Sequence, residues 1–405
     1  MANLTRLIDA LLAEGIEPFV TLYHWDTPQA LEDEYEGWLS PRMERDFLNY
    51  ADIAFRAFGN RVKKWITLNE PWTMCTLAYT VGIHAPGRCS NREVCSKGNS
   101  STEPYIVAHN MINAHAAVVE LYRNKYQSQQ EGMIGIALNM DWFEPLRNTT
   151  LDMKASERRH EFSFGWFFDP IVFGAYPKSM VHHVGSRLPE FTPFQRDRVK
   201  GSFDFLGFNH YSSKYVWHVE RRYSGAGWFE DVAVRQSEYL YPHKNDGIIG
   251  PQAYSPWLHR APWGFHKALK WIRHRYGNPF LYVTENGCDD PLDANSTLSD
   301  ILHDTYRMKY LAGYLASLDL AIQEGSDIRG YFVWSLVDNF EWVSGFSAQF
   351  GLYYVNFSDP SRKRQPKQSA AYYSNYVNSH RYNVSSIKKS AEHVRREIWG
   401  RRSNT

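Results

Sequence analysis

The chain has 405 residues and a formal net charge of +1, with 43% hydrophobic and 22% charged residues. This composition is typical of a globular protein, and the nearly neutral charge gives no reason to expect an acidic partner such as a nucleic acid. No apolar stretch approaches the roughly 18 to 20 residues of a membrane-spanning helix, so a membrane is not expected as a partner either. The length allows one large domain or two.

The N-terminal residues, MANLTRLIDALLAEGIEPFV, carry a polar residue every few positions, which predicts an amphipathic helix ended by Gly15. They do not resemble a signal peptide, so the chain as given is expected in the cytoplasm. Cys89 and Cys95 flank a short polar loop that a disulfide would close in an oxidising compartment, although two free thiols fit the sequence equally. With six Asn-X-Ser/Thr sequons, this pair favours the secretory pathway or an extracellular location if an N-terminal segment is missing.

Short β-rich runs alternate with longer helical patterns along the chain, an order that favours βα units around a parallel sheet. The predicted strands cover residues 17–24, 63–69, 133–139, 203–209, 280–285 and 328–335. The predicted helices cover residues 41–58, 104–126, 155–166, 264–276, 299–324 and 367–379. Because no repeat, low-complexity tract or linker interrupts this order, we expect residues 1–405 to form a single domain.

Polar or ionisable side chains stand at the ends of most of these predicted strands. They are His24, Asn69, Asn139, Asn209 and Glu285. Such groups are costly in a core, but at the carboxyl ends of barrel strands they converge on the face where (β/α)8 enzymes place their chemistry. The sequence therefore predicts an α/β fold of the (β/α)8 TIM barrel type.

Six strands are too few for a closed barrel, which needs eight, and the first residues form a helix where a strand should come first. An open parallel barrel leaves unpaired strand edges and an uncovered core, and both are unfavourable. We therefore expect that the first strand, the first helix and the second strand of the barrel are absent, and that the domain is N-terminally incomplete.

The first candidate motif is TLNEPW, in which a predicted strand ends on Asn69 and Glu70 and Pro71 prevents its continuation. Burial near Trp65 and Trp72 would disfavour the charged carboxylate, raise its pKa and suit Glu70 to general acid catalysis. The alternative interpretation is a surface turn with an incidental glutamate.

The second candidate motif is YVTENG, where a strand ends on Glu285 and Asn-Gly forms a turn. A retaining glycosidase needs two carboxyl groups about 5 to 5.5 Å apart, one protonated and one ionised. Two glutamates at strand ends of one barrel fit that requirement.

At these motifs the chain resembles glycoside hydrolase family 1, the β-glucosidases and their relatives. TLNEP and VTENG match its catalytic signatures, and LYHWDTPQALED, HAPG, TEPYIVAHN, FDFLGFNHY, PWGFHKALKWI and GYFVWSLVDNFEW match further segments in the family's order. The resemblance covers essentially the whole chain. It implies a retaining β-glucosidase that hydrolyses terminal β-D-glucosyl residues from O-glycosides or short β-linked oligosaccharides, with no cofactor and no metal.

The resemblance makes Glu70 the general acid/base and Glu285 the nucleophile, with the hydroxyl of Tyr211 hydrogen-bonded to the nucleophile. A phenol can donate to a carboxylate and help to keep it ionised. The sugar-binding positions of the family correspond to His24, Asn69, Trp334, Glu341 and Trp342. Taken alone, a histidine or tryptophan is more often a core residue, and only the matched segments favour binding.

The aglycone side of the site is less readable. We expect Trp142, Phe162, Trp257 and the long insertion over residues 219–256 to line or border the entrance, or else to be structural. Trp25 is interpreted as structural.

Two residues of the resembled family lack counterparts: a glutamine on the first strand that holds the sugar, and an arginine on the second strand near the nucleophile. An arginine beside Glu285 would lower the pKa of that carboxyl, so its absence weakens the nucleophile assignment. The chain is then a fragment of a full enzyme, an inactive truncated isoform, or a barrel completed in trans. The competing function is a noncatalytic glycan-binding or receptor-interaction barrel, but the retained Glu70 and Glu285 favour an enzyme.

Overall fold

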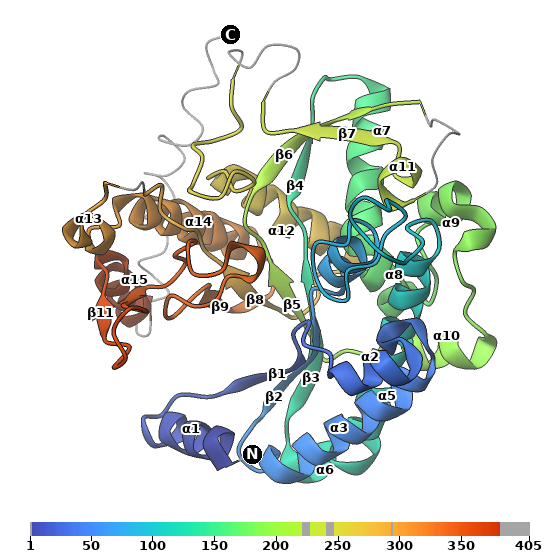
Figure 1. The fold of residues 1–405 in the computed structure, drawn as a ribbon, viewed down its shortest axis with the longest axis horizontal. Coiled ribbons are helices and arrows are strands. Elements are labelled where there is room, and N and C mark those ends of the chain that lie inside the picture. Colours follow the sequence, from blue (N-terminus) through green and yellow to red (C-terminus); the bar gives the residue numbers. More distant parts are fainter. Residues whose placement is uncertain (1, 221–226, 240–246, 293–294, 381–405) are drawn as a thin grey trace.

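The computed structural model describes residues 2–220, 227–239, 247–292 and 295–380. A parallel sheet of six strands, bent into a half-barrel, lies at its centre (Figure 1). In spatial order its strands are β1 (Phe19–Tyr23), β2 (Lys64–Asn69), β3 (Met133–Asn139), β5 (Phe205–Asn209), β8 (Leu281–Asn286) and β9 (Ile328–Val333). All six predicted strands are confirmed, and their order in space is their order in the chain, so that each βα unit lies beside the next.

Helices lie along the outside of this sheet, as the βα alternation predicts (Figure 1). The longer ones are α1 (Ala2–Ala13), α3 (Arg42–Phe58), α5 (Glu103–Lys125), α7 (Thr150–His160), α8 (Trp166–Phe173), α12 (Pro262–Tyr276), α14 (Thr305–Gln323) and α15 (Gln368–His380). The shorter ones are α2 (Gln29–Tyr35), α4 (Pro71–Thr73), α6 (Gln127–Gln130), α9 (Lys178–Val184), α10 (Pro193–Val199), α11 (Trp228–Asp231) and α13 (Leu298–Leu302).

Two predicted helices have different boundaries in the structure. The segment predicted as one helix over 155–166 consists of α7, a π-helical turn at Glu161–Gly165 and the start of α8. The segment predicted over 299–324 is divided into α13 and α14, because His303 and Asp304 leave helical geometry between them. In both segments the apolar spacing continues through the break, so periodicity alone does not reveal it.

Two small sheets were not predicted. One joins β4 (Trp142–Pro145), β6 (Ser213–His218) and β7 (Val234–Ser237), and the other is a hairpin of β10 (Tyr353–Val355) and β11 (Arg364–Pro366). β4 begins three residues after β3 ends, and β6 begins four residues after β5 ends. Each therefore extends the chain beyond a barrel strand, where the sequence shows no separate turn signal.

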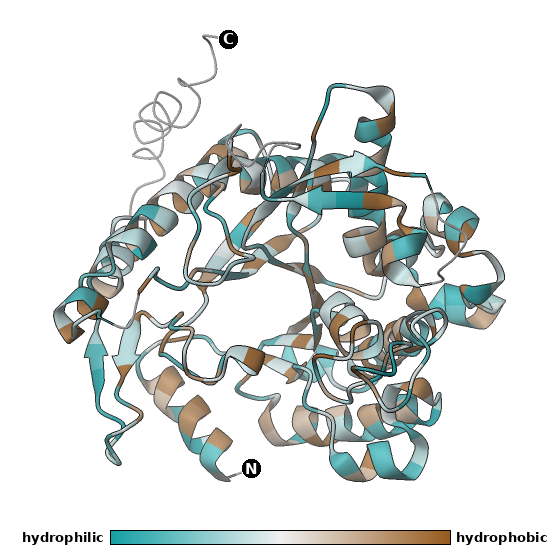
Figure 2. Cartoon of the chain, turned by 45° about the horizontal axis from the view of Figure 1, so that its top comes forward, coloured by the Kyte–Doolittle hydropathy of each residue, from teal (hydrophilic) through white to brown (hydrophobic). Residues whose placement is uncertain are grey.

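The hydrophobic core fills the space between the sheet and its helices. Its largest fully buried side chains include Trp38, Trp65, Trp166 and Trp228. α3 is amphipathic, because its buried residues Met43, Phe47, Ala51, Ala54, Phe55 and Phe58 recur at helical spacing. Figure 2 shows the hydropathy of each residue along the chain. None of the helices in the described ranges is both long enough and apolar enough to cross a membrane.

The two outer strands of the sheet, β1 and β9, each have one parallel neighbour among the described residues. The ring of Phe19, at the amino end of β1, lies 4.9 Å from the ring of Phe332, near the carboxyl end of β9, measured between centroids. Large apolar side chains are exposed on α1 and around these outer strands. They include Leu4, Leu7, Leu12, Ile16 and Phe332. Figure 2 shows the apolar residues of α1, drawn in brown beside the N-terminus.

Candidate active site

A cavity of about 420 Å³ opens at the carboxyl ends of the sheet strands. Its walls include four of the five polar residues predicted at strand ends, namely His24, Asn139, Asn209 and Glu285. The fifth, Asn69, is buried directly beneath and hydrogen-bonds to both His24 (3.0 Å) and Asn209 (3.1 Å). The prediction that these side chains converge on one face is confirmed.

Glu70 lies at the point where β2 gives way to α4. Its φ of 43° and ψ of 59° place it in the left-handed region, which is uncommon for a residue with a side chain and turns the carboxyl into the cavity. Pro71 then starts α4, where its missing N–H costs no hydrogen bond. The sharp local turn, rather than the strand itself, therefore aims Glu70.

The Glu70 carboxyl is buried and accepts two hydrogen bonds, from Nδ2 of Asn209 and from Oγ1 of Thr73, both at 2.8 Å. Burial raises the pKa of Glu70 to about 7, because desolvation penalises the charged form more than these two donors stabilise it. The predicted elevation of this pKa is confirmed in direction. Of the two tryptophans expected around it, Trp72 lines the cavity, whereas Trp65 is fully buried and packs on Phe55.

Glu285 extends into the same cavity from β8, on the other side of β3 and β5 from Glu70. Its Oε2 accepts the hydroxyl of Tyr211 at 2.7 Å, the contact expected for Tyr211. Burial first, and then the nearby Glu70 carboxyl, raise the pKa of Glu285 well above its usual range, while the Tyr211 hydroxyl lowers it. The two carboxyl groups are thus close enough to affect each other's ionisation.

Asn209 connects the two glutamates. Its backbone is in register with Glu285 across the β5–β8 pair, and its side chain donates to Glu70. Its Oδ1 accepts the hydroxyl of Thr284, which fixes the amide orientation. The sequence marked Asn209 as a polar strand end but not as a site residue, and Thr73 carried no signal beyond its position three residues after Glu70.

Four of the five predicted sugar-holding residues lie in the cavity wall, and the fifth, Asn69, lies beneath it. His24, Trp334, Glu341 and Trp342 all line the cavity, and the His24 ring is stacked on Trp342 at 5.6 Å between centroids. Nε1 of Trp334 donates to Glu341 at 3.3 Å, and burial raises the pKa of Glu341 to about 7. Trp25, interpreted as structural, also lines the cavity and lies 4.4 Å from Trp342.

Only one of the three aromatic residues expected at the entrance lies there. Trp257 lines the cavity and packs edge-on against Tyr211. Trp142 donates instead to Glu144 beside β4, and Phe162 is fully buried against Trp228. The sequence did not indicate that Phe162 is buried, because it lies in the unpredicted π-helical turn at Glu161–Gly165.

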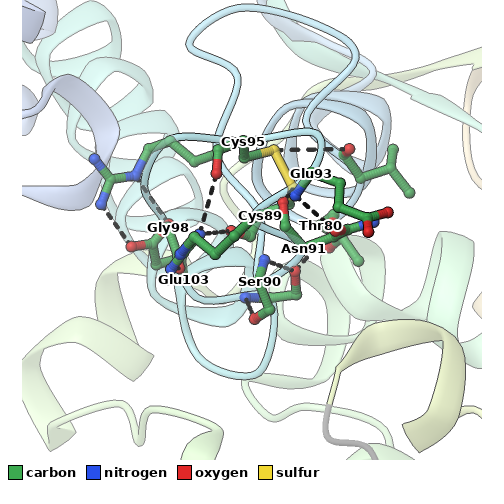
Figure 3. Close-up of a disulfide and its surroundings, with 12 residues drawn as sticks. Thr80, Cys89, Ser90, Asn91, Glu93, Cys95, Gly98 and Glu103 are labelled. Atoms are coloured by element: carbon green, nitrogen blue, oxygen red, sulfur yellow. Dashed lines mark hydrogen bonds and ion pairs between the residues drawn. A yellow bond between two sulfur atoms is a disulfide. The ribbon is translucent and has the colours of Figure 1, made fainter.

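Cys89 and Cys95 form a disulfide, which decides between the two alternatives left open by the sequence (Figure 3). It closes the loop after Ile83 and His84, two residues that line the cavity. The Arg88 side chain anchors the same loop through a buried ion pair with Glu103 at 2.6 Å. The Cys89–Cys95 disulfide and the Arg88–Glu103 ion pair thus both hold the segment that follows Ile83 and His84.

The cavity wall contains four carboxyl groups, those of Glu70, Asp141, Glu285 and Glu341, and one guanidinium, that of Arg159. Across the described ranges, no group of three or more His, Cys, Asp or Glu side chains is arranged to hold a metal ion. The chemistry that these side chains support is proton transfer and attack by a carboxylate.

Comparison with known proteins gives a consistent result. Residues 1–382 match the model of glycosyl hydrolase family 1. Beta-glucosidase 40 of Arabidopsis thaliana is 49% identical over 377 residues, which are 92% of this chain and 74% of that protein. Beta-glucosidase 6 of Oryza sativa subsp. japonica is 48% identical over 371 residues, 91% of this chain and 71% of that protein.

The fold of the chain is also similar to solved structures of β-glucosidases. The rice Os3BGlu6 beta-glucosidase matches with a TM-score of 0.88 and 48% identity, over 91% of this chain and 77% of that chain. A mutant of the same rice enzyme in a covalent complex with Glc also has a TM-score of 0.88, at 47% identity and the same coverage.

Proposed function

The chain belongs to glycosyl hydrolase family 1, and we propose that it cleaves terminal β-D-glucosyl residues from O-glycosides with Glu70 and Glu285 as its two reacting carboxyl groups. It is a retaining β-glucosidase. The observation that carries the residue assignment is the pair of buried carboxyls that meet in one cavity, one held by Asn209 and Thr73 and the other by Tyr211.

The proposed reaction has two displacements. In the first, the Glu285 carboxylate attacks the anomeric carbon, the bond from that carbon to the leaving oxygen breaks, and the proton of Glu70 passes to that oxygen. In the second, Glu70 takes a proton from water, the resulting hydroxide attacks the same carbon, and the bond to Glu285 breaks. Both carboxyl groups return to their starting states. The covalent complex with Glc seen in the related rice enzyme supports such an intermediate.

The electrostatics favour one proton shared by the pair at neutral pH. Two desolvated carboxylates repel each other, so the first to lose its proton raises the pKa of the second. In the proposed ground state Glu285 carries the charge and accepts the Tyr211 hydroxyl, and Glu70 carries the proton. That distribution is the one the first displacement needs.

The sugar-binding role of the predicted residues is part of the proposal. Hydroxyl groups of a sugar need fixed donors and acceptors, which His24 and Glu341 supply from the cavity wall, and Asn69 holds the His24 ring from beneath. Trp334 and Trp342 offer flat apolar faces for the ring. A β-glucoside or a short β-linked oligosaccharide fits these groups.

We further propose that the half-barrel is six-eighths of a single (β/α)8 domain and that a strand, a helix and a second strand complete it. The relatives in this family are (β/α)8 barrels, and β1 and β9 each lack a parallel neighbour on one side among the described residues. The exposed apolar residues of α1 and β9 support the proposal that these further elements pack against them. The Cys89–Cys95 disulfide supports an oxidising compartment for the protein.

The test is release of 4-nitrophenol from 4-nitrophenyl β-D-glucoside by the 405-residue chain, by Glu285→Gln, and by a chimera carrying the strand–helix–strand segment of a family member. Turnover that disappears in Glu285→Gln supports the two-carboxylate assignment. If the chimera melts at a higher temperature and turns over faster than the chain alone, the incomplete-barrel proposal is supported. Equal melting temperatures would contradict it, and turnover unchanged in Glu285→Gln would contradict the assignment of Glu285.

A further inference from the structure

Arg159 is a charged side chain in an unusual position. It comes from α7, is only 4% exposed, and lines the cavity beside Trp72, which follows Glu70 by two residues. A buried charge is costly unless a counter-ion and hydrogen bonds compensate it. Within the described ranges, no carboxylate lies within 4 Å of this guanidinium, so its compensation is incomplete.

Three aromatic rings surround the Arg159 guanidinium. Its central carbon is 4.1 Å from the centroid of Phe143, 4.6 Å from Trp228 and 5.4 Å from Trp72. These faces attract the cation and fix the plane of the guanidinium, but they accept no conventional hydrogen bond. The cage therefore holds the group in place without neutralising it.

The guanidinium of Arg159 has more N–H donors than hydrogen-bond acceptors among its described neighbours. Nε donates to Gln236 at 3.3 Å and Nη1 donates to Ser163, both neutral acceptors. Among the described residues, Nη2 has no hydrogen-bond partner, although a guanidinium carries five N–H groups. Burial lowers the pKa of Arg159 to about 9, which still leaves it charged at neutral pH.

From this geometry we infer that Arg159 is a specificity-determining residue, and that it receives a carboxylate carried on an aromatic aglycone. The inference rests on the proposed β-glucosidase function and extends it to the class of leaving group. The planar fork of a guanidinium matches the two oxygens of a carboxylate, and the apolar walls formed by Trp72 and Phe143 suit the ring that carries it.

Asp141 limits this preference. Its carboxyl also lines the cavity and acts on Arg159 electrostatically, although it is not within ion-pair distance. It attracts the guanidinium and repels an anionic aglycone. Removal of the Asp141 charge should therefore strengthen the preference for a carboxylate on the aglycone, whereas removal of the Arg159 charge should abolish it.

The experiment compares kcat/KM for 3- and 4-carboxyphenyl β-D-glucosides with kcat/KM for their methyl esters. The acid-to-ester ratio of each enzyme is divided by that of the wild type, which cancels the intrinsic difference between the leaving groups. We expect Arg159→Met to lower this ratio by about tenfold for at least one isomer, since a charge-assisted hydrogen bond is lost. Asp141→Asn should raise it by roughly threefold.

Arg158→Met is the matched control, because it removes the same charge from the adjacent residue. Arg158 donates to the carbonyls of Val232 and Ala233 and is absent from the cavity wall. The inference is overturned if Arg158→Met lowers the acid-to-ester ratio as much as Arg159→Met does, or if Arg159→Met leaves that ratio unchanged. In either case, hydrolysis of the methyl esters would still support the proposed β-glucosidase function. If no glucoside is hydrolysed, the proposed function fails. Calorimetric binding of benzoate to wild type but not to Arg159→Met then supports the Arg159 subsite, and equal binding overturns it.

Discussion

Glu70 and Glu285 are both glutamates, and both lie at the carboxyl end of a buried parallel strand. Their surroundings nevertheless differ. Glu70 accepts an amide and a hydroxyl, from Asn209 and Thr73, and its pKa is raised to about 7 by burial. Glu285 accepts the phenol of Tyr211, and both burial and its neighbour raise its pKa. If Glu70 is the acid and Glu285 the nucleophile, as we propose, their neighbouring side chains and not the glutamates themselves must separate the two roles.

The largest effect should come from Glu285→Gln. Without a carboxylate to attack the anomeric carbon, we expect kcat to fall by about 10⁴-fold or more, as when other enzymes lose a nucleophile. Steady-state hydrolysis of 4-nitrophenyl β-D-glucoside measures this loss. Added azide should restore turnover in Glu285→Gly and yield the α-glucosyl azide, because glycine opens the space from which the Glu285 carboxylate would attack. Rescue that yields the β-azide instead would assign the nucleophile elsewhere.

Glu70→Gln should produce a smaller loss that depends on the leaving group. General acid catalysis contributes typically about 10² to 10⁴-fold, and a leaving group that departs without a proton does not need it. We therefore expect kcat/KM for phenyl β-D-glucoside to fall by about 10³-fold and that for the 2,4-dinitrophenyl compound far less. Equal losses for the two substrates would argue against Glu70 as the acid.

Tyr211→Phe tests the donor that distinguishes Glu285. The Tyr211 hydroxyl lowers the pKa of that carboxyl, so its removal should raise this pKa. Because Glu285 must be ionised to attack, the acidic limb of the kcat/KM pH profile should move to higher pH. Loss of one hydrogen bond to a charged group predicts a decrease in kcat/KM of about tenfold or more. An unmoved acidic limb would mean that Tyr211 serves only packing.

Thr73→Val tests the corresponding donor on Glu70 and should have the smallest effect. The Thr73 hydroxyl lowers the pKa of Glu70, so its loss should raise that pKa. Since Glu70 must be protonated to act as the acid, the basic limb should move upward by about half to one pH unit, and the acidic limb should stay in place. A shift of the acidic limb in this variant would show that the Thr73 hydroxyl also affects the pKa of Glu285, so that the surroundings of the two glutamates do not act independently.

The strands and the face they share could be predicted from the sequence. The alternation of β-rich and helical runs, and the polar residues that follow apolar strands, depend on local patterns of a few residues each. For the same reason His24, Asn139, Asn209 and Glu285 could be expected on one side of the molecule before their contacts were known. Recognition of Tyr211 and of the residues around Trp342 depended on the resemblance to a family.

The partners of those side chains were decided only by the tertiary structure. The contact of Asn209 with Glu70 spans 139 residues, and the contact of Arg159 with Gln236 spans 77. Strand register and helix breaks set such contacts, and a shift of one residue would turn each side chain to the opposite face. The sequence by itself therefore determined which groups stand at the strand ends, whereas packing across the half-barrel decided which carboxyl received which donor and left a guanidinium in the cavity wall.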